Sequence, residues 1–154
     1  MNGSTQRGYN TDVDPLADYP IVVAVDVRYR DLDTFNHVNN AVYLTYFEQA
    51  RVAYFAELGW TSRDDSVVVA RAEVNYRRAI VLGQKVRVGC RVARFGTKSY
   101  TMEYRVLADG EPAADGITVQ AFVSGGRGAP LPNELRERIL AVEARVGRQP
   151  DRSR

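Results

Sequence analysis

The alternation of apolar and polar residues predicts a strand, a long helix and then four further strands. Residues 21–29 place Ile, Val, Val, Val and Tyr at every second position, the period-two pattern of a strand with one buried face. Residues 40–58 carry apolar side chains nearly all round a helical axis, and a helix of this kind is usually buried. The later alternating stretches are residues 68–77, 85–92, 100–106 and 117–123.

Turn residues and a second helix complete the predicted fold. Asp109-Gly110 is a strong hairpin signal between the last two strands. Residues 133–146 predict an amphipathic helix, with Leu135 and Ile139 on its apolar face. Strands with one apolar face need a cover, and the long helix is the obvious one. The pattern therefore predicts an α+β fold, in which an antiparallel sheet wraps around one long central helix, with a further helix at the C-terminus.

The 154 residues fit one domain. We expect a flexible N-terminal leader over residues 1–19, with order beginning near Pro20, a single domain over residues 20–146 and a flexible tail over residues 147–154. A small sheet exposes strand edges, and exposed edges favour pairing with another copy of the chain. A homodimer or homotetramer is therefore expected.

Composition and charge exclude several classes of function. The formal net charge is only +2, and no basic recognition motif is present, so nucleic acid is not an expected partner. No apolar run approaches the roughly 20 residues that span a bilayer, and no secretory signal precedes the domain. The one cysteine, Cys90, and the one histidine, His37, argue against a disulfide or a zinc site. A cytoplasmic protein without metal or cofactor is expected.

The polar segment at residues 31–40 precedes the long helix and carries the candidate chemistry. It contains two aspartates, three asparagines and the histidine. A helix N-terminus offers unpaired amides and a partial positive charge, which suit a developing oxyanion. A neighbouring carboxylate can act as a general base or nucleophile on an acyl carbonyl. The same residue types also cap helices and form turns, and a lone histidine is usually structural, so the pattern leaves both explanations open.

A resemblance favours the catalytic explanation. Residues 29–51, YRDLDTFNHVNNAVYLTYFEQAR, resemble the 4-hydroxybenzoyl-CoA thioesterase-like hotdog family, and the His-Val-Asn-Asn segment is similar to that of acyl-ACP thioesterases. The stretch VNYRRA at residues 74–79, followed by Gly83, resembles the family's second strand and turn. The resemblance covers about residues 21–124. It implies a hotdog fold and the hydrolysis of an acyl-CoA or acyl-ACP to a free acid and a thiol, with coenzyme A as part of the substrate.

The resemblance also implies roles for three residues of the loop. The family's catalytic aspartate falls on Asp33, as general base or nucleophile, and the oxyanion-binding amide falls at Asn40. His37 matches the histidine of the acyl-ACP branch, where it can orient Asp33 or the substrate carbonyl. Two departures set this chain apart: Phe35 stands where the acyl-ACP branch has asparagine, and Asn39-Asn40 stand where the bacterial acyl-CoA branch often has Tyr-His. Asp33 is therefore the firmest assignment.

Further residues are expected to bind the substrate. Seven basic residues and no acid lie between residues 77 and 98, and the phosphates of coenzyme A or the acidic surface of a carrier protein need positive partners. A solvated strand face is the alternative interpretation. Glu48 matches a family glutamate, and as a buried carboxylate it is expected to be neutralised by Arg51 or another basic residue. The expected substrate-binding residues are Asn39, Tyr43, Phe47, Arg77, Arg78 and Lys98.

Two other functions stay open at this point. A hotdog dehydratase acting on 3-hydroxyacyl thioesters is one, although that branch pairs its histidine and acid differently from this loop. A non-catalytic module that binds acyl thioesters is the other, since a fold does not settle a function.

Overall fold

In the computed structural model, which describes residues 13–152, the β-strands form one seven-stranded sheet. Its five long strands are antiparallel and lie in the order β1-β3-β4-β5-β2. Their bounds are Ile21–Val25 for β1, Asp65–Tyr76 for β2, Val86–Phe95 for β3, Ser99–Ala108 for β4 and Glu111–Ser124 for β5. The short strands β6 (Arg127–Gly128) and β7 (Asp151–Arg152) extend the sheet, and a 3-10 turn, η1, covers Tyr29–Asp31.

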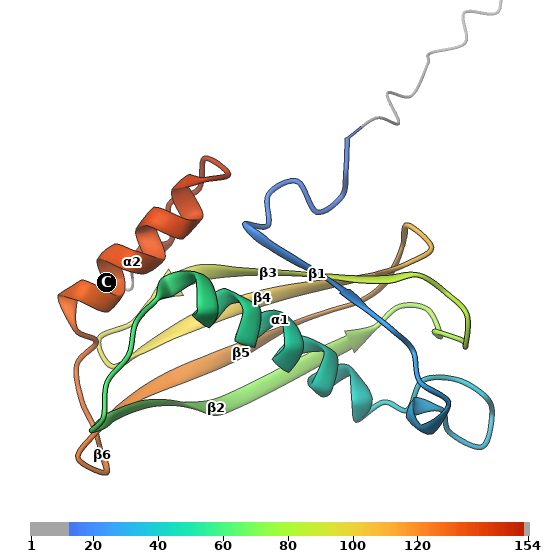
Figure 1. Cartoon of the computed structure of the whole chain (residues 1–154), viewed down its shortest axis with the longest axis horizontal. Coiled ribbons are helices and arrows are strands. Elements are labelled where there is room, and N and C mark those ends of the chain that lie inside the picture. The colour runs from blue at the N-terminus through green and yellow to red at the C-terminus, as the bar shows by residue number, and fades with distance from the viewer. Residues whose placement is uncertain (1–12, 153–154) are drawn as a thin grey trace, which may run out of the picture.

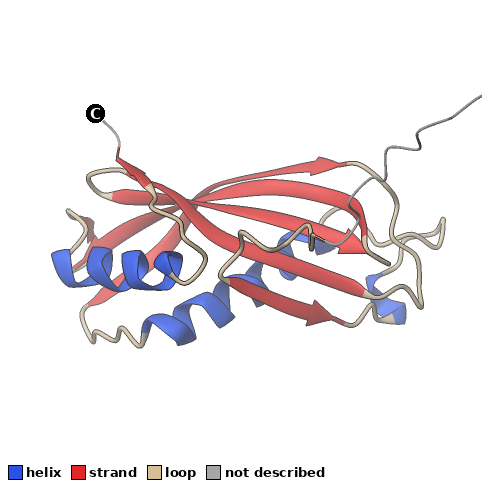
Figure 2. Ribbon diagram, turned by 90° about the horizontal axis from the view of Figure 1, so that it is seen from above, coloured by secondary structure: helices blue, strands red, loops and turns tan. Residues whose placement is uncertain are grey.

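Two helices lie on one side of this sheet. The long helix α1 (Val42–Leu58) runs along the sheet, and α2 (Asn133–Ala144) lies near the C-terminal end of α1 (Figures 1 and 2). The predicted fold class, an antiparallel sheet around a central helix with a second helix at the C-terminus, is confirmed. The helix begins at Val42, two residues later than predicted.

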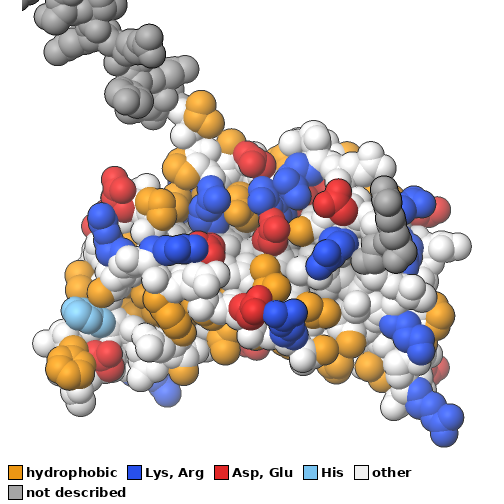
Figure 3. All heavy atoms as spheres, turned by 180° about the vertical axis from the view of Figure 1, so that it is seen from behind, with side chains coloured by type: hydrophobic (Ala, Val, Ile, Leu, Met, Phe, Trp, Pro, Cys, Tyr) orange, Lys and Arg blue, Asp and Glu red, His pale blue; other side chains and the backbone are white. Residues whose placement is uncertain are grey.

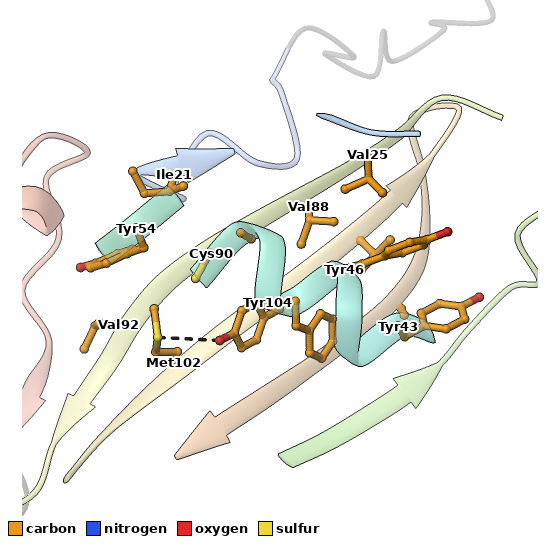
Figure 4. Packing of buried hydrophobic residues seen from close by; sticks show 14 of the residues in the cluster. Ile21, Val25, Tyr43, Tyr46, Tyr54, Val88, Cys90, Val92, Met102 and Tyr104 are labelled. Atoms are coloured by element: carbon orange, nitrogen blue, oxygen red, sulfur yellow. Dashed lines mark hydrogen bonds between the residues drawn. The ribbon is translucent and has the colours of Figure 1, made fainter. Parts of the chain in front are cut away.

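The core lies between α1 and the inner face of β3 and β4 (Figure 4). Alternate residues of the two strands point toward the helix, as the period-two pattern predicts. The fully buried side chains there include Val88, Cys90, Met102, Tyr104, Tyr46 and Phe47. Burial raises the pKa of the Cys90 thiol well above its usual range, which keeps it protonated and unreactive.

One face of α1 stays uncovered in the single chain, so the expectation of burial all round is wrong for it. Val52 is 61% exposed and Leu44 is also exposed. The edge strand β2 is exposed along most of its length, including Val68 and Val69. The reason is topological: β2 pairs only with β5, at the border of the sheet, and leaves its other edge open.

The hairpin between β4 and β5 forms where the sequence predicts it. Asp109 and Gly110 both have positive φ, 49° and 81°, as a two-residue turn that matches the twist of the strands requires. The Asp109 carboxylate also accepts the Lys85 N–H at 2.8 Å, which ties this turn to the start of β3.

Packed structure begins before Pro20, which corrects the predicted leader. Leu16 and Tyr19 are buried against Leu107 on the outer face of the sheet. The Asp14 carboxylate pairs with the Arg87 guanidinium at 2.8 Å. Charged side chains of both signs gather on this outer face (Figure 3). Residues 1–12 of the predicted leader lie outside the described residues.

The C-terminal segment is also more ordered than predicted. Strand β7 pairs in parallel with Arg94 and Phe95 of β3. Part of the segment that was expected to be a flexible tail therefore belongs to the sheet. The last two residues of that tail, 153 and 154, lie outside the described part of the chain.

A buried carboxylate fastens α2 to the rest of the fold. Glu143 is fully buried and accepts the Tyr54 hydroxyl of α1 at 2.8 Å and the Val92 N–H of β3 at 2.6 Å. The Arg148 guanidinium lies 3.5 Å from its other oxygen. One side chain thus joins both helices and the sheet.

Candidate active site

The loop between η1 and α1 holds Asp33 by its own backbone. Asp33 Oδ1 accepts the N–H groups of Phe35 at 2.8 Å and His37 at 3.2 Å, and the Asp33 N–H donates to the His37 carbonyl at 2.8 Å. Asn36, at the tip, adopts a positive φ of 61°, which asparagine tolerates better than most residues. The second carboxylate oxygen, Oδ2, makes no hydrogen bond within the described residues, so it is free for chemistry.

Asp31 anchors this loop to α1. Its buried carboxylate accepts Arg28 Nη2 at 2.8 Å and the Tyr46 hydroxyl at 3.1 Å. Burial alone would raise the pKa of Asp31, but the hydrogen bonds from Arg28 and Tyr46 and the charge of Arg28 outweigh it and hold this pKa below its usual range. Asp31 therefore shapes the loop as an ionised structural residue, and Tyr46 is part of that anchor.

The backbone amide of Asn40 is unpaired at the start of α1. The neighbouring amides donate to fixed acceptors: Val38 N–H to the Ile80 carbonyl (2.8 Å), Asn39 N–H to the Asp31 carbonyl (2.8 Å), Ala41 N–H to Asn39 Oδ1 (3.0 Å) and Val42 N–H to the Asn39 carbonyl (2.9 Å). Within residues 13–152, the Asn40 N–H has no such acceptor. An unpaired amide at a helix start is the kind of group that binds an oxyanion.

Six of the predicted site residues line a single hollow of about 250 Å³. It brings the loop, the start of α1 and the end of β2 together, although these segments are distant in the sequence. Those six residues are Asp33, His37, Asn40, Tyr43, Arg77 and Arg78. Burial raises the pKa of the Tyr43 phenol, so this wall of the hollow stays uncharged.

The remaining predicted site residues lie elsewhere. Phe47 is fully buried and stacks on Tyr104 at 4.3 Å between ring centres, because its position one turn further along α1 places it over the sheet. Lys98 lies in the turn between β3 and β4, where its carbonyl accepts the Phe122 N–H, at the opposite end of the sheet from the hollow. Asn39 faces the helix start and holds Ala41. The structure does not join Phe47 or Lys98 to the other site residues.

Glu48 differs from its expected environment. Its side chain is 65% exposed, so it is not the buried carboxylate that was predicted. Its partner is Arg51, as expected, with 3.8 Å between the charged atoms. The Arg51 guanidinium is turned toward the core, where it donates to the Tyr104 hydroxyl at 3.2 Å.

The two arginines at the hollow differ in their partners. Arg77 Nε donates to Asp115 Oδ2 at 2.9 Å, and the Asn75 amide donates to the other oxygen of the same carboxylate. Burial acts to raise the pKa of Asp115, but its bonds with Arg77 and Asn75 hold it below the usual range. Arg78 has no carboxylate partner among the described residues. Arg78 is therefore the uncompensated cation at the hollow.

Tyr76 is a site residue that the sequence reasoning missed. It ends β2, lines the hollow and donates its hydroxyl to the Asn40 carbonyl at 2.7 Å. Its ring meets the Tyr43 ring edge-on, with centroids 5.0 Å apart. The period-two pattern assigned Tyr76 only to the apolar members of a strand. Its place beside Arg77 and Arg78 was the signal that could have identified it.

Two further observations concern ligands and membranes. Residues 13–152 contain no cluster of three or more His, Cys, Asp or Glu side chains arranged to hold a metal ion. Neither α1 nor α2 combines the length and the apolar character that a helix needs to cross a bilayer.

Comparisons with known proteins identify the family. Residues 27–139 match the model of the thioesterase-like superfamily. The chain is 31% identical over 121 residues to the uncharacterised protein YsmA of Bacillus subtilis, covering 75% of this chain and 82% of that protein. It is 28% identical over 123 residues to the long-chain acyl-CoA thioesterase FadM of Escherichia coli, covering 75% and 93%.

A solved structure supports the same relation. A thioesterase of Thermus thermophilus, crystallised with coenzyme A and zinc, superposes with a TM-score of 0.77 at 47% sequence identity, covering 82% of this chain and 96% of that one. The region that matches the family model spans the loop, α1, the four long strands β2 to β5 and the first part of α2. The chain belongs to the thioesterase-like superfamily of hotdog-fold proteins.

Proposed function

We propose that this protein hydrolyses acyl-CoA thioesters, with Asp33 as the general base or nucleophile. The observation that carries the proposal is the hollow that is lined both by Asp33 and by Asn40, whose amide is unpaired within the described residues. A carboxylate and an oxyanion donor at one site are the two groups that acyl transfer to water requires. Acyl-ACP is the second candidate carrier.

The chemistry follows from these two groups. The thioester carbonyl oxygen accepts the Asn40 N–H, where the positive end of α1 also stabilises negative charge. Asp33 takes a proton from water as the water oxygen bonds to the carbonyl carbon. The tetrahedral oxyanion then collapses, the C–S bond breaks, and the proton passes to the departing sulfur to give a free acid and a thiol. His37, on the wall of the hollow, would orient the carbonyl.

A panel of thioesters tests this function. The protein is incubated with acyl-CoAs of increasing chain length, an aromatic acyl-CoA and an acyl-ACP, and free thiol is followed by a chromogenic reagent. Thiol release from at least one of them is expected. Release from none would overturn the proposal, and loss of water from a 3-hydroxyacyl-CoA without thiol release would identify a dehydratase instead.

The choice of coenzyme A rests on charge and on the relatives. Arg78 presents an uncompensated cation at the hollow, and cations of this kind suit the phosphates of the nucleotide. FadM is an acyl-CoA thioesterase, and the Thermus thioesterase was crystallised with coenzyme A. We assign Arg77 a weaker part, because Asp115 already neutralises it.

Arg78→Ala is expected to raise the KM for an acyl-CoA about 10-fold, the effect of losing one charge-assisted hydrogen bond to phosphate. The KM for the matching N-acetylcysteamine thioester, which lacks the nucleotide, should stay unchanged. Steady-state kinetics on both substrates measure this. Arg94→Ala, which removes an exposed cation from β3, is the matched control. An equal rise in KM for both substrates would contradict a role in binding phosphate.

We also propose that a second copy covers β2 and the open face of α1. Open strand edges and exposed apolar faces favour association. This chain has both: β2 leaves one edge unpaired and exposes its valines, and α1 exposes Val52. A homodimer is the simplest closed assembly, and two such dimers would form the tetramer. We place the protein in the cytoplasm, in agreement with its single buried thiol.

Val69→Asp is expected to weaken this association about 100-fold or more, because each copy would have to bury an unpaired carboxylate at the β2 edge. Light scattering after size-exclusion chromatography measures the mass over a dilution series. Val22→Asp places the same charge on the other edge strand, β1, and should leave the mass unchanged. A dimer that survives Val69→Asp but not Val22→Asp would assign the interface to β1.

A further inference from the structure

We propose that Tyr76 is a positioning residue that helps to hold the backbone of Asn40, whose N–H is the oxyanion-binding amide. This inference rests on the proposed thioesterase function and extends it to a residue outside the loop. It joins the last residue of β2 to the start of α1, two elements that lie far apart in the sequence.

The Tyr76 hydroxyl is one of the groups that hold the backbone of Asn40. Of its two backbone groups, the N–H faces no acceptor, and the carbonyl accepts only the Tyr76 hydroxyl, at 2.7 Å, within the described residues. The residue precedes the first turn of α1, so the helical ladder does not hold it. The peptide group that carries the Asn40 N–H is held at its other end, where the Asn39 carbonyl accepts the Val42 N–H, and the Tyr76 bond holds the peptide group that follows. An oxyanion donor works only if it already points at the place where the charge develops.

Tyr76 itself is held firmly. Its ring packs edge-on against the buried Tyr43 ring. Its strand pairs with β5 at Ala114, and the next two amides, of Arg77 and Arg78, both donate to the Ala113 carbonyl at 2.8 and 3.1 Å. The hydroxyl therefore extends from a fixed strand end and can transmit that rigidity to Asn40.

The geometry separates this role from direct contact with the substrate. The only hydrogen of the Tyr76 hydroxyl is already directed to the Asn40 carbonyl, so it is not available to a thioester oxygen. A positioning role predicts a loss in turnover with substrate binding intact, because the oxyanion forms only in the transition state. A substrate contact would instead raise KM.

Tyr76→Phe is expected to lower kcat about 10-fold and to leave KM for an acyl-CoA within about twofold. Complete loss of an oxyanion donor costs about 100- to 1,000-fold in kcat, and a misdirected amide keeps part of that stabilisation. Tyr19→Phe is the matched control, since it removes a tyrosine hydroxyl on the outer face of the sheet and should leave kcat unchanged. Thermal unfolding of both variants confirms that each is folded under the assay conditions.

A vibrational measurement reports on the amide directly. In an Asp33→Asn background, which slows hydrolysis, an acyl-CoA labelled with carbon-13 at the carbonyl is bound and its stretching frequency is recorded by isotope-edited infrared spectroscopy. Hydrogen bonding to Asn40 lowers this frequency. Adding Tyr76→Phe should move it back toward that of the free thioester, which a merely structural change elsewhere would not do.

The outcomes are separable. A kcat for Tyr76→Phe equal to that of an active wild type, or an unchanged carbonyl frequency, would overturn the positioning role alone. A raised KM with unchanged kcat would also overturn it, in favour of a substrate contact. A wild-type protein that hydrolyses no acyl thioester would overturn the proposed function itself.

Discussion

Replacing Asp33 by asparagine is expected to lower kcat by about 100-fold or more. Loss of a general base costs about 100- to 10,000-fold, and asparagine can neither take the proton from water nor attack the carbonyl. The change is nearly isosteric, and the asparagine oxygen can still accept the Phe35 and His37 amides that hold the loop. The loss should therefore appear in kcat with the fold intact, measured as thiol release from the best acyl-CoA.

Two comparisons sharpen this experiment. Asp26→Asn makes the same substitution at an exposed position outside the hollow and should retain full activity. His37→Ala is expected to cost less than Asp33→Asn, because the only hydrogen bonds that His37 makes within the described residues run through its backbone. If Asp33→Asn turns over as fast as the wild type, the assignment of the base or nucleophile is wrong.

Replacing Glu143 by alanine is expected to lower the free energy of unfolding by about 3–5 kcal/mol. The substitution leaves the buried Val92 N–H and Tyr54 hydroxyl without an acceptor and removes the partner of Arg148. Each buried group without a partner costs about 1–3 kcal/mol, and breaking a buried ion pair costs about 3–5 kcal/mol. Urea unfolding followed by circular dichroism measures the change.

The Glu143→Gln variant separates the hydrogen bonds from the charge. Its amide oxygen can still accept both donors, so it should be much less destabilised than Glu143→Ala. A loss as large as that of alanine would show that the charge of Glu143, rather than its acceptor role, holds α2. Thiol release should persist in the folded fraction of both variants, because Glu143 lies outside the hollow.

The titration of Glu143 makes the stability of the fold depend on pH, in a direction that follows from its pKa. Burial raises the pKa of Glu143 above its usual value of 4.5, despite the opposing bonds from Val92 and Tyr54. The unfolded chain therefore loses the proton at a lower pH than the folded one. Below pH 4.5, Glu143 is protonated in both states and its contribution to stability is fully present. This contribution is lost as the pH rises through the higher pKa of the folded state. Relative to Glu143→Gln, the wild type should become less stable over this rise.

Much of the fold follows from local patterns. The period-two stretches locate β3 and β4, because their inner faces meet one helix and their outer faces carry mainly polar side chains. Asp109-Gly110 places the hairpin, because few residues other than Asn, Asp and Gly adopt positive φ at both turn positions. These features depend on residues close together in the chain, so the sequence alone suffices to find them.

Features that depend on distant contacts could not be predicted in this way. Strand β2 pairs with β5, and no feature of the β2 sequence indicates which strand is its partner. Leu16 and Tyr19 become buried only because Gly89, on the outer face of β3, leaves room for them: an added Cβ there would lie 2.7 Å from the Tyr19 ring. A polar segment with one leucine and one tyrosine otherwise has the composition of a loose terminus.

The same distinction between local and distant contacts applies to the candidate site. Asp33, His37 and Asn40 are close in sequence, so their loop could be predicted as a unit. The basic run from Arg77 to Lys98 was expected to form a single patch. Strand β3 lies between these two residues in the chain, so they are at opposite ends of the sheet. The hydroxyl of Tyr76 finds its acceptor 36 residues earlier in the chain, a contact that periodicity does not encode.

The strand order has a consequence for the time at which this chain can first act. Strands β3, β4 and β5 form a meander of neighbouring hairpins, which can form early because each pairing is local. Strand β2 must wait for β5, which follows it much later in the chain, and β2 brings Tyr76 and the two arginines to the loop. A chain emerging from the ribosome thus exposes Asp33 early but completes the proposed catalytic centre only after residue 124 has been synthesised. Nascent chains should therefore be inert toward thioesters until nearly the whole sheet has formed.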